Sequence, residues 1–195
     1  MLEESLRDIE QGTCVQMPFP HLVVPSFFDR AMGDSVFNWL DTNLVWEFTE
    51  TCFYTQFELN LLHTELPEAV QFLVSEAMIR STADTIKKAF NEPILQLVDV
   101  AAHKLVNGHR MGVHNDFIGP EETHRMVIQL NKGWDADKGG FLMLFNSDRP
   151  ADVSTIIKPI NNSAIAFEIS PKSYHAVSAV HDFTRYTIVY TFKRI

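Results

Sequence analysis

The sequence predicts a mainly β fold with supporting helices, arranged as a barrel or jelly roll. From residue 94 onward, short β-like runs separated by turn residues follow one another. Two segments with helical spacing precede these runs. The 195 residues are 46% apolar and include 15 Phe, enough for one sizeable core. We therefore expect a single domain over residues 1–195, with helical support over about 29–90 and a barrel core over about 94–195.

The supporting segments come first along the chain. A possible cap at Asp29 precedes apolar residues at helical spacing and predicts a helix over about 29–43. Pro67 is compatible with a first helical turn, and residues 68–90 are rich in helix formers, which predicts a second helix. Between them, residues 46–60 alternate as one strand, whose polar face carries Tyr54, Gln56 and Glu58.

The β-like runs of the expected core cover residues 94–106, 111–114, 125–130, 141–145, 155–158, 164–169, 174–180 and 184–193. Side chains of a barrel alternate inward and outward, so residues far apart in sequence can meet at one cavity. On the last run Arg185 and Thr187 share one face, while Tyr186 and Ile188 share the other. If Arg185 points inward, the cavity mouth is cationic.

Composition excludes several classes of function. The net charge of −9, with no compensating basic run, argues against nucleic-acid binding. Cys14 and Cys52 are the two cysteines, too few for a disulfide-rich secreted domain, so we expect a reducing cytoplasm. The acidic, polar N-terminal residues resemble no targeting signal, and no apolar run approaches the ~18 residues of a membrane helix. We therefore expect a cytoplasmic protein that does not enter membranes.

One constellation of residues has a chemistry that can be named. His114, Asp116 and His175 supply two imidazoles and one carboxylate, a facial set that leaves positions on iron(II) open for a substrate and dioxygen. On an extended segment, residues 114 and 116 would share a face, with Asn115 pointing away. A His-x-acid triplet also occurs at His63, where no matching downstream histidine and arginine follow; we interpret it as exposed polar surface.

Several further motifs accompany this set over residues 102–194. They are the segments 127–134 and 142–145, the pair Gly139–Gly140, Pro159, residues 174–177 and the pair Arg185–Tyr186. Together they resemble the iron(II)- and 2-oxoglutarate-dependent dioxygenases, in the prolyl-hydroxylase-like branch. Residues 130–136 are similar to hypoxia-factor prolyl hydroxylases, and residues 139–145 to ribosomal prolyl hydroxylases.

The resemblance implies a double-stranded β-helix, a cupin-like jelly-roll barrel. It implies Fe(II) held by the three residues named above, 2-oxoglutarate as co-substrate, O₂, and ascorbate as a candidate reductant. Arg185 would bind the far carboxylate of 2-oxoglutarate, because guanidinium forms a planar fork that keeps its proton. Gln129 stands where related hydroxylases carry a tyrosine that touches that carboxylate, and Thr187 is a further candidate donor. Related enzymes often place tyrosines before the first metal histidine, where this chain has Leu105 and Met111.

The expected reaction is hydroxylation of an unactivated C–H of an amino acid or peptidyl residue, prolyl-like, with succinate and CO₂ as co-products. Tyr54, Gln56 and Glu58 are candidate substrate contacts. Trp134 is another candidate, although packing at a turn is its simpler explanation. A non-catalytic, metal-stabilised barrel that binds or senses a small molecule stays open as the alternative. Asp116 argues against halogenation, which would need its coordination position. The sequence predicts no oligomeric state.

Other residues receive simpler interpretations. His103, His109 and His124 are expected at the surface or as support near the site, without binding metal. Gly139 and Gly140 predict a tight turn before a strand, since no helix follows to bind phosphate. The sequence assigns no role to Arg125.

Overall fold

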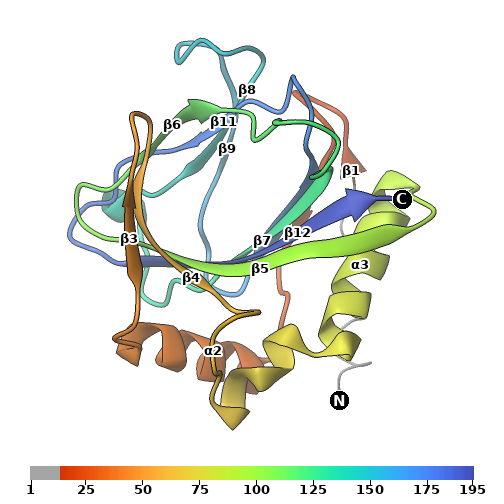
Figure 1. Cartoon of the computed structure of the whole chain (residues 1–195). Helices are drawn as coiled ribbons and strands as arrows, with labels where there is room; N and C mark the ends of the chain where they lie inside the picture. The colour runs from red at the N-terminus through yellow and green to blue at the C-terminus, as the bar shows by residue number, and fades with distance from the viewer. Residues whose placement is uncertain (1–13) are drawn as a thin grey trace.

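The computed structural model describes residues 14–195, which fold into two antiparallel sheets with helices on one side (Figure 1). The larger sheet has the strand order β1 (Cys14–Val15), β2 (His21–Val24), β10 (Ala164–Glu168), β7 (His124–Gln129), β12 (Arg185–Arg194), β5 (Leu95–Leu105), β4 (Thr55–Asn60) and β3 (Glu47–Glu50). The smaller sheet has the order β6 (Met111–His114), β11 (His175–Val177), β8 (Leu142–Phe145) and β9 (Val153–Ile157).

The predicted jelly roll is confirmed, but the sheets do not close into a barrel. Between β4 and β6 the two sheets meet at a single isolated bridge, which pairs Tyr54 with Met111. Within residues 14–195, no ladder joins a strand of one sheet to a strand of the other. The strands of the smaller sheet are short, from three to five residues, and their buried side chains pack against β5 and β10 of the larger sheet.

The first supporting helix forms as predicted, and the second is interrupted. Helix α2 (Arg30–Thr42) begins after Asp29, whose side chain accepts a hydrogen bond from the amide of Met32. The single helix expected over 68–90 is wrong. A 3-10 helix, η2 (Glu68–Val74), is followed by α3 (Glu76–Phe90), because the backbone of Ser75 is extended and its hydroxyl caps α3 at Met78.

The single strand expected over residues 46–60 is also wrong, because the chain reverses within it. Strands β3 and β4 form a hairpin in which Glu47 pairs with Glu58. At the turn, the hydroxyl of Thr51 accepts hydrogen bonds from the amides of Phe53 and Tyr54. Strands β1 and β2 were not predicted. They extend the larger sheet beyond β10.

Hydrophobic cores lie on both faces of the larger sheet. On the helical face, alternate residues of β12 pack with α2, η2 and α3: Tyr186, Ile188, Tyr190 and Phe192. Burying side chains of this size stabilises the fold by roughly 1.5–3 kcal/mol each. A second cluster, including Leu105, Leu144 and Phe167, lies between the two sheets. The predicted alternation of β12 is confirmed, because its other face lines a cavity on this second side.

The helices of the described chain, residues 14–195, include none long and apolar enough to span a bilayer. Helix α3 and helix α2 both lie on the face of the larger sheet that is turned away from the smaller sheet (Figure 1). The opposite face is therefore left free to build a site between the sheets.

Candidate functional site

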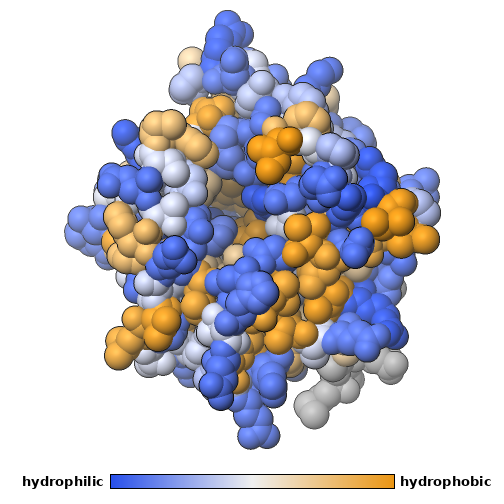
Figure 2. Space-filling view, viewed as in Figure 1, coloured by the Kyte–Doolittle hydropathy of each residue, from blue (hydrophilic) through white to orange (hydrophobic). Residues whose placement is uncertain are grey.

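A cavity of about 220 Å³ lies between the two sheets. The face shown in Figure 2 is hollowed near its middle, with hydrophobic residues visible in the depression. The lining combines apolar side chains with a small group of charged and polar ones, which is typical of ligand sites. The polar and ionisable residues of the lining are Tyr54, Gln56, Glu58, His103, His114, Asp116, Arg125, His175, Arg185 and Thr187.

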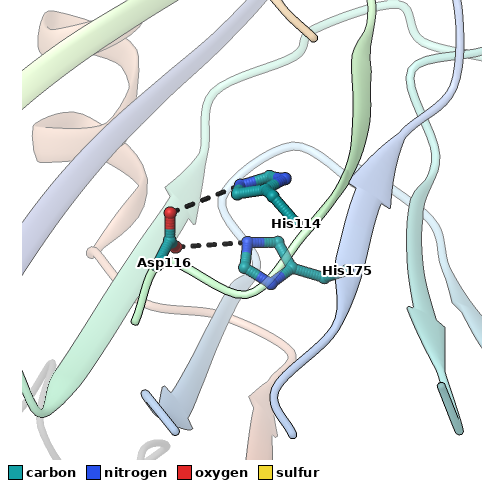
Figure 3. Close-up of side chains that lie close together, drawn as sticks. All are labelled: His114, Asp116 and His175. Carbon is teal, nitrogen blue, oxygen red and sulfur yellow. Dashed lines mark ion pairs between the residues drawn. The ribbon is translucent and has the colours of Figure 1, made fainter. Parts of the chain in front are cut away.

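Three of these side chains form a group that could hold a metal ion. One ligand atom from each of His114, Asp116 and His175 lies within 4.8 Å of the others. The two histidines belong to neighbouring strands, since His114 ends β6, His175 begins β11, and the two are register partners. In Figure 3 the three side chains point toward one another, with His114 Nε2 3.3 Å and His175 Nε2 3.2 Å from the Asp116 carboxylate.

A turn, not an extended strand, brings Asp116 to the histidines. Strand β6 ends at His114, and Asp116 has a φ of 58°, in the left-handed region. The expectation that residues 114 and 116 share the face of one strand is therefore wrong. Asn115 holds the turn, because its side chain bonds Pro171 and its carbonyl accepts a hydrogen bond from Ser173. Aspartate tolerates this backbone conformation better than most residues.

Hydrogen bonds orient both histidines. Nδ1 of His114 lies 2.9 Å from the carbonyl of Gly112, and Nδ1 of His175 lies 2.8 Å from the carbonyl of Ser173. A carbonyl only accepts, so each Nδ1 carries the proton when the ring is neutral and each Nε2 keeps its lone pair. Both Nε2 atoms face Asp116, and this is the arrangement that metal coordination requires.

Arg125 is the residue of this site that sequence reasoning missed. Its Nη1 donates to Asp116 Oδ2 at 2.6 Å, and its Nη2 donates to Glu122 at 2.7 Å. Burial alone would raise the pKa of Asp116, but the positive charge of Arg125 holds that pKa well below its usual range. Asp116 is therefore ionised. The alternation of β7 could have identified Arg125, which shares a strand face with Gln129.

Arg185 occupies a second part of the cavity as a buried cation. Its side chain is 3% exposed, and its Nε has no hydrogen-bond partner among residues 14–195. No ion pair to Arg185 occurs in the same part of the chain. Burial lowers the pKa of Arg185 to about 10, so it stays charged at neutral pH. A buried guanidinium without a counter-ion is a site for an anion.

The neighbours of Arg185 add donors of the same kind. Gln129 and Thr187 are register partners on β7 and β12, and both are buried. The Gln129 amide orientation is set by Asn131, whose Nδ2 donates to Gln129 Oε1 at 3.2 Å. Nε2 of Gln129 is left without a partner among the described residues, 14–195. Arg185 and Gln129 therefore have unused N–H groups, but of the three predicted co-substrate residues only Arg185 and Thr187 line the cavity.

Of the two adjacent glycines, Gly140 leaves room for the Arg185 side chain and Gly139 for the neighbouring backbone. Gly139 and Gly140 have φ values of 63° and 67°, which fits the tight turn predicted for them. A Cβ on Gly140 would lie 2.9 Å from Cδ of Arg185, and one on Gly139 would lie 2.1 Å from the carbonyl oxygen of Ala179. Both positions therefore require glycine, for its conformation and for its lack of a side chain.

Two polar residues of β4, and Tyr54 directly before that strand, form a third part of the cavity. Tyr54, Gln56 and Glu58 all line it. Nε2 of Gln56 donates to Glu58 at 2.7 Å, while Oε1 of Gln56 is buried and has no partner within residues 14–195. Burial raises the pKa of Tyr54, and the negative charge of Glu58 and a hydrogen bond to it raise it further. Trp134 does not line the cavity; its Nε1 donates to Gly139 at 2.8 Å, so it packs at the turn.

The other histidines stay outside the metal-ligating group of the described chain. His103 lines the cavity, and burial lowers its pKa to about 4, assisted by the positive charges of Arg125 and Arg185. His109 stacks on Phe57 with 5.5 Å between the ring centroids. His124 is fully buried, which excludes the surface position, one of the two positions expected for it.

Comparisons with known proteins agree with this geometry. A family model described as the 2OG-Fe(II) oxygenase superfamily matches residues 100–193. Over 57 residues, 28% of this chain, the sequence is 39% identical to prolyl 3-hydroxylase OGFOD1 of Mus musculus. That match spans 10% of the length of the mouse protein.

Solved structures show the same fold at low identity. An oxidoreductase of the 2OG-Fe(II) oxygenase family from Burkholderia pseudomallei has a TM-score of 0.70 and 16% identity, covering 100% of this chain and 92% of its own. A Pseudomonas putida prolyl-4-hydroxylase has a TM-score of 0.67 and 18% identity over 100% of both chains. A Trichoplax adhaerens prolyl hydroxylase, solved with a hypoxia inducible factor peptide fragment, has a TM-score of 0.71 and 15% identity, covering 99% and 92%.

Proposed function

We propose that this chain, whose residues 100–193 match the 2OG-Fe(II) oxygenase superfamily, is an iron(II)- and 2-oxoglutarate-dependent dioxygenase that hydroxylates an unactivated C–H of an amino acid or peptidyl residue. The proposed co-products are succinate and CO₂. One observation carries the proposal: a single cavity is lined both by the His114, Asp116 and His175 group and by the buried, unpaired guanidinium of Arg185.

The donor set fits a ferrous ion. Two neutral imidazoles and one carboxylate form the facial arrangement of non-haem iron oxygenases and leave open positions. Both histidines are held by backbone carbonyls with Nε2 free, and Asp116 is ionised. Arg125 would hold the second oxygen of Asp116 and so fix the direction of the first. When bound together, iron, 2-oxoglutarate and O₂ supply the oxidant for C–H hydroxylation.

The second part of the cavity fits the co-substrate. Arg185 would bind the far carboxylate of 2-oxoglutarate through two parallel N–H bonds. Gln129 Nε2, unpartnered in residues 14–195, and the hydroxyl of Thr187 are the further donors proposed for this carboxylate. Val127 and Val189 line the same cavity and would keep water from the reacting atoms. The chain's contribution is binding, orientation and exclusion of water.

A prolyl or other amino-acid residue is the proposed substrate, free or within a peptide. The resemblance to prolyl hydroxylases supports this class, and the Trichoplax adhaerens relative was solved with a peptide fragment. Tyr54, Gln56 and Glu58 are the proposed substrate contacts, since they line the cavity at and directly before β4.

Coupled turnover tests the proposal. Purified protein with Fe(II), ascorbate and 2-oxoglutarate is incubated with amino acids and proline-containing peptides, and succinate and products that gain one oxygen are measured by mass spectrometry. His175→Ala should abolish succinate formation. His63→Ala is the matched control, because His63 is exposed. It begins the other His-x-acid triplet, which has no matching downstream histidine and arginine.

Binding of 2-oxoglutarate, measured by calorimetry under anaerobic conditions, provides a second readout. If the protein does not bind 2-oxoglutarate, and an Arg185 variant behaves as wild type, the proposal is wrong. Stabilisation by iron without succinate formation on any substrate would favour the alternative, a barrel that binds or senses a small molecule.

A further inference from the structure

We propose that the substrate of this site carries a cationic nitrogen, an ammonium or guanidinium group, that binds Glu58 and Gln56 on β4. The inference rests on the proposed function and names the chemical class of its substrate. It follows from two groups in the cavity: a carboxylate that has no cation beside it, and an amide oxygen that accepts no hydrogen bond from the described residues.

Glu58 is a cavity-lining carboxylate without a cation. No ion pair within residues 14–195 includes it. Its partners are the Gln56 amide, at 2.7 Å, and the hydroxyl of Tyr54. Lys104 is paired in register with Phe57, and its Nζ lies 5.0 Å above the Phe57 ring. Alternation along β4 puts Phe57 on the opposite face from Glu58, so this lysine does not neutralise Glu58.

A second carboxylate faces Glu58 across the hairpin. Glu47 on β3 is its direct antiparallel partner, so the two side chains project from the same face. Like charges in directly opposite positions destabilise a sheet. Glu47 also has no ion pair within the described chain, 14–195. A bound cation would relieve this repulsion.

Gln56 gives an independent indication that points to an N–H donor. A carboxylate only accepts, so Nε2 of Gln56 must be the atom that donates to Glu58. This fixes the amide orientation and leaves Oε1 as an acceptor. The side chain is 4% exposed and lines the cavity, and Oε1 has no partner among residues 14–195. An ammonium or guanidinium has enough N–H groups to satisfy both Oε1 and Glu58.

The charges elsewhere in the cavity already have counterparts. Asp116 is paired with Arg125, and Arg125 is also paired with Glu122. The proposed counterpart of Arg185 is the far carboxylate of 2-oxoglutarate. Among the described lining residues, Glu58 is left as the carboxylate without a cation. A prolyl residue inside a peptide has neither positive charge nor N–H, whereas a basic side chain or a free α-ammonium has both.

Binding of four lysine derivatives tests the proposal on the ligand side. L-Lysine has two ammonium groups, Nε-acetyl-L-lysine has the α-ammonium, Nα-acetyl-L-lysine amide has the side-chain ammonium, and Nα,Nε-diacetyl-L-lysine amide has none. L-Arginine and its Nα-acetyl amide extend the set to guanidinium. Dissociation constants are measured by calorimetry on the protein loaded with Fe(II) and 2-oxoglutarate without oxygen. We expect at least one singly cationic compound to bind at least tenfold more tightly than the neutral one.

The pattern of binding also identifies the source of the cation. A requirement for the side-chain ammonium or guanidinium indicates a basic residue that can lie within a peptide. A requirement for the α-ammonium indicates a free amino acid or the N-terminal residue of a peptide. Equal binding of neutral and cationic compounds, or binding of none of the cationic ones, would overturn the proposal.

Substitution on the protein side gives a second test. Glu58→Gln keeps the shape of the side chain and removes the charge, so affinity for the cationic compound should fall by about 10- to 100-fold. Glu50→Gln is the matched control, because Glu50 is exposed on the same hairpin and pairs with Thr55, on the other face. Affinity for 2-oxoglutarate should be unchanged in both variants. Equal losses of cation affinity in the two variants would contradict a specific role for Glu58.

Failure of this inference can be separated from failure of the proposed function. If a neutral prolyl peptide is hydroxylated and cationic compounds do not bind, the dioxygenase remains and the cation site is wrong. If neither 2-oxoglutarate binding nor turnover occurs, the proposed function itself is wrong.

Discussion

Replacing Arg185 by methionine should stabilise the protein without 2-oxoglutarate and abolish its response to 2-oxoglutarate. Arg185 is 3% exposed and has no ion pair in the described residues, 14–195. Methionine has a similar length and fills an irregular apolar space without a charge. The substitution therefore removes an uncompensated buried cation and keeps most of the packing.

The magnitude follows from the pKa. Burial lowers the pKa of Arg185 from 12.5 to about 10. The charged form is therefore disfavoured in the folded state by about 3 kcal/mol relative to the unfolded chain. At pH 7, below both pKa values, the guanidinium is protonated in both states and the full cost is present. We expect Arg185→Met to raise the free energy of unfolding by about 1 to 3 kcal/mol, after some loss of packing.

Urea unfolding at pH 7, in anaerobic buffer with Fe(II), measures this change. Without 2-oxoglutarate, the variant should unfold at a higher urea concentration than wild type. At a 2-oxoglutarate concentration one hundred times its dissociation constant, wild type should gain about 2.7 kcal/mol and the variant nothing. The stability difference between the two proteins should therefore shrink or reverse.

A matched control shows whether replacing any arginine by methionine would change the free energy of unfolding in the same way. Arg149 is exposed and its Nη2 lies 3.4 Å from Asp152. Arg149→Met should change the free energy of unfolding by less than about 1 kcal/mol and leave the 2-oxoglutarate response intact. If Arg185→Met destabilises the protein and still responds to 2-oxoglutarate, the reasoning about the buried guanidinium is refuted.

Two further predictions concern Gly140, which contacts Arg185, and the cavity-lining His103. Gly140→Ala should weaken 2-oxoglutarate binding about tenfold, because its Cβ would lie 2.9 Å from Cδ of Arg185, and a shift of that side chain misplaces its hydrogen bonds. Gly133 also has a positive φ, but no atom lies near the position of an added Cβ. Gly133→Ala is therefore the control, and calorimetry should give an unchanged dissociation constant for 2-oxoglutarate. Burial lowers the pKa of His103 from 6.5 to about 4, so the unfolded chain binds the proton more readily than the folded protein. The free energy of unfolding should therefore fall by about 3 kcal/mol as the pH falls from above 6.5 to below 4. In urea unfolding of metal-free protein, His103→Asn should flatten that pH dependence, and an unchanged slope would contradict the assignment.

Regular alternation and clear caps made part of the fold predictable. The two faces of β12 could be assigned from period-two spacing, since every second residue is apolar and packs on the helices. The start of α2 was predictable because Asp29 is a strong capping residue before a helical apolar pattern. These features depend on near neighbours in the sequence, and for that reason sequence reasoning could identify them.

Breaks within apparently regular segments were not predictable. Ser75 lies inside a run of strong helix formers, yet its backbone is extended and its side chain caps α3. Thr51 closes the β3 to β4 turn through its hydroxyl, without glycine or proline, so the sequence has no strong turn signal there. In both places a side-chain hydrogen bond overrides the local pattern.

The candidate site divides in the same way. The histidines and Arg185 could be selected from their spacing and from resemblance to a family. The position of Asp116 depends on a left-handed turn that strand alternation does not predict. The contact of Arg125 with Asp116 and the free acceptor of Gln56 depend on contacts that side chains make only in the folded molecule. Sequence patterns can identify such residues as candidates, but they do not show which side chains these residues contact.

The unpaired hydrogen-bond donors and the unpaired acceptor lie at different places in the site. Arg185 and Gln129 leave N–H groups unused, whereas Gln56 leaves an oxygen unused beside the carboxylate of Glu58. A dicarboxylate placed against Glu58 would be repelled, and a cation placed against Arg185 would be repelled as well. Two ligands of opposite charge therefore cannot exchange places. Under the proposed function, this sorting would keep 2-oxoglutarate at the arginine and direct the substrate to β4, so that each reaches the metal-ligating group from its own side.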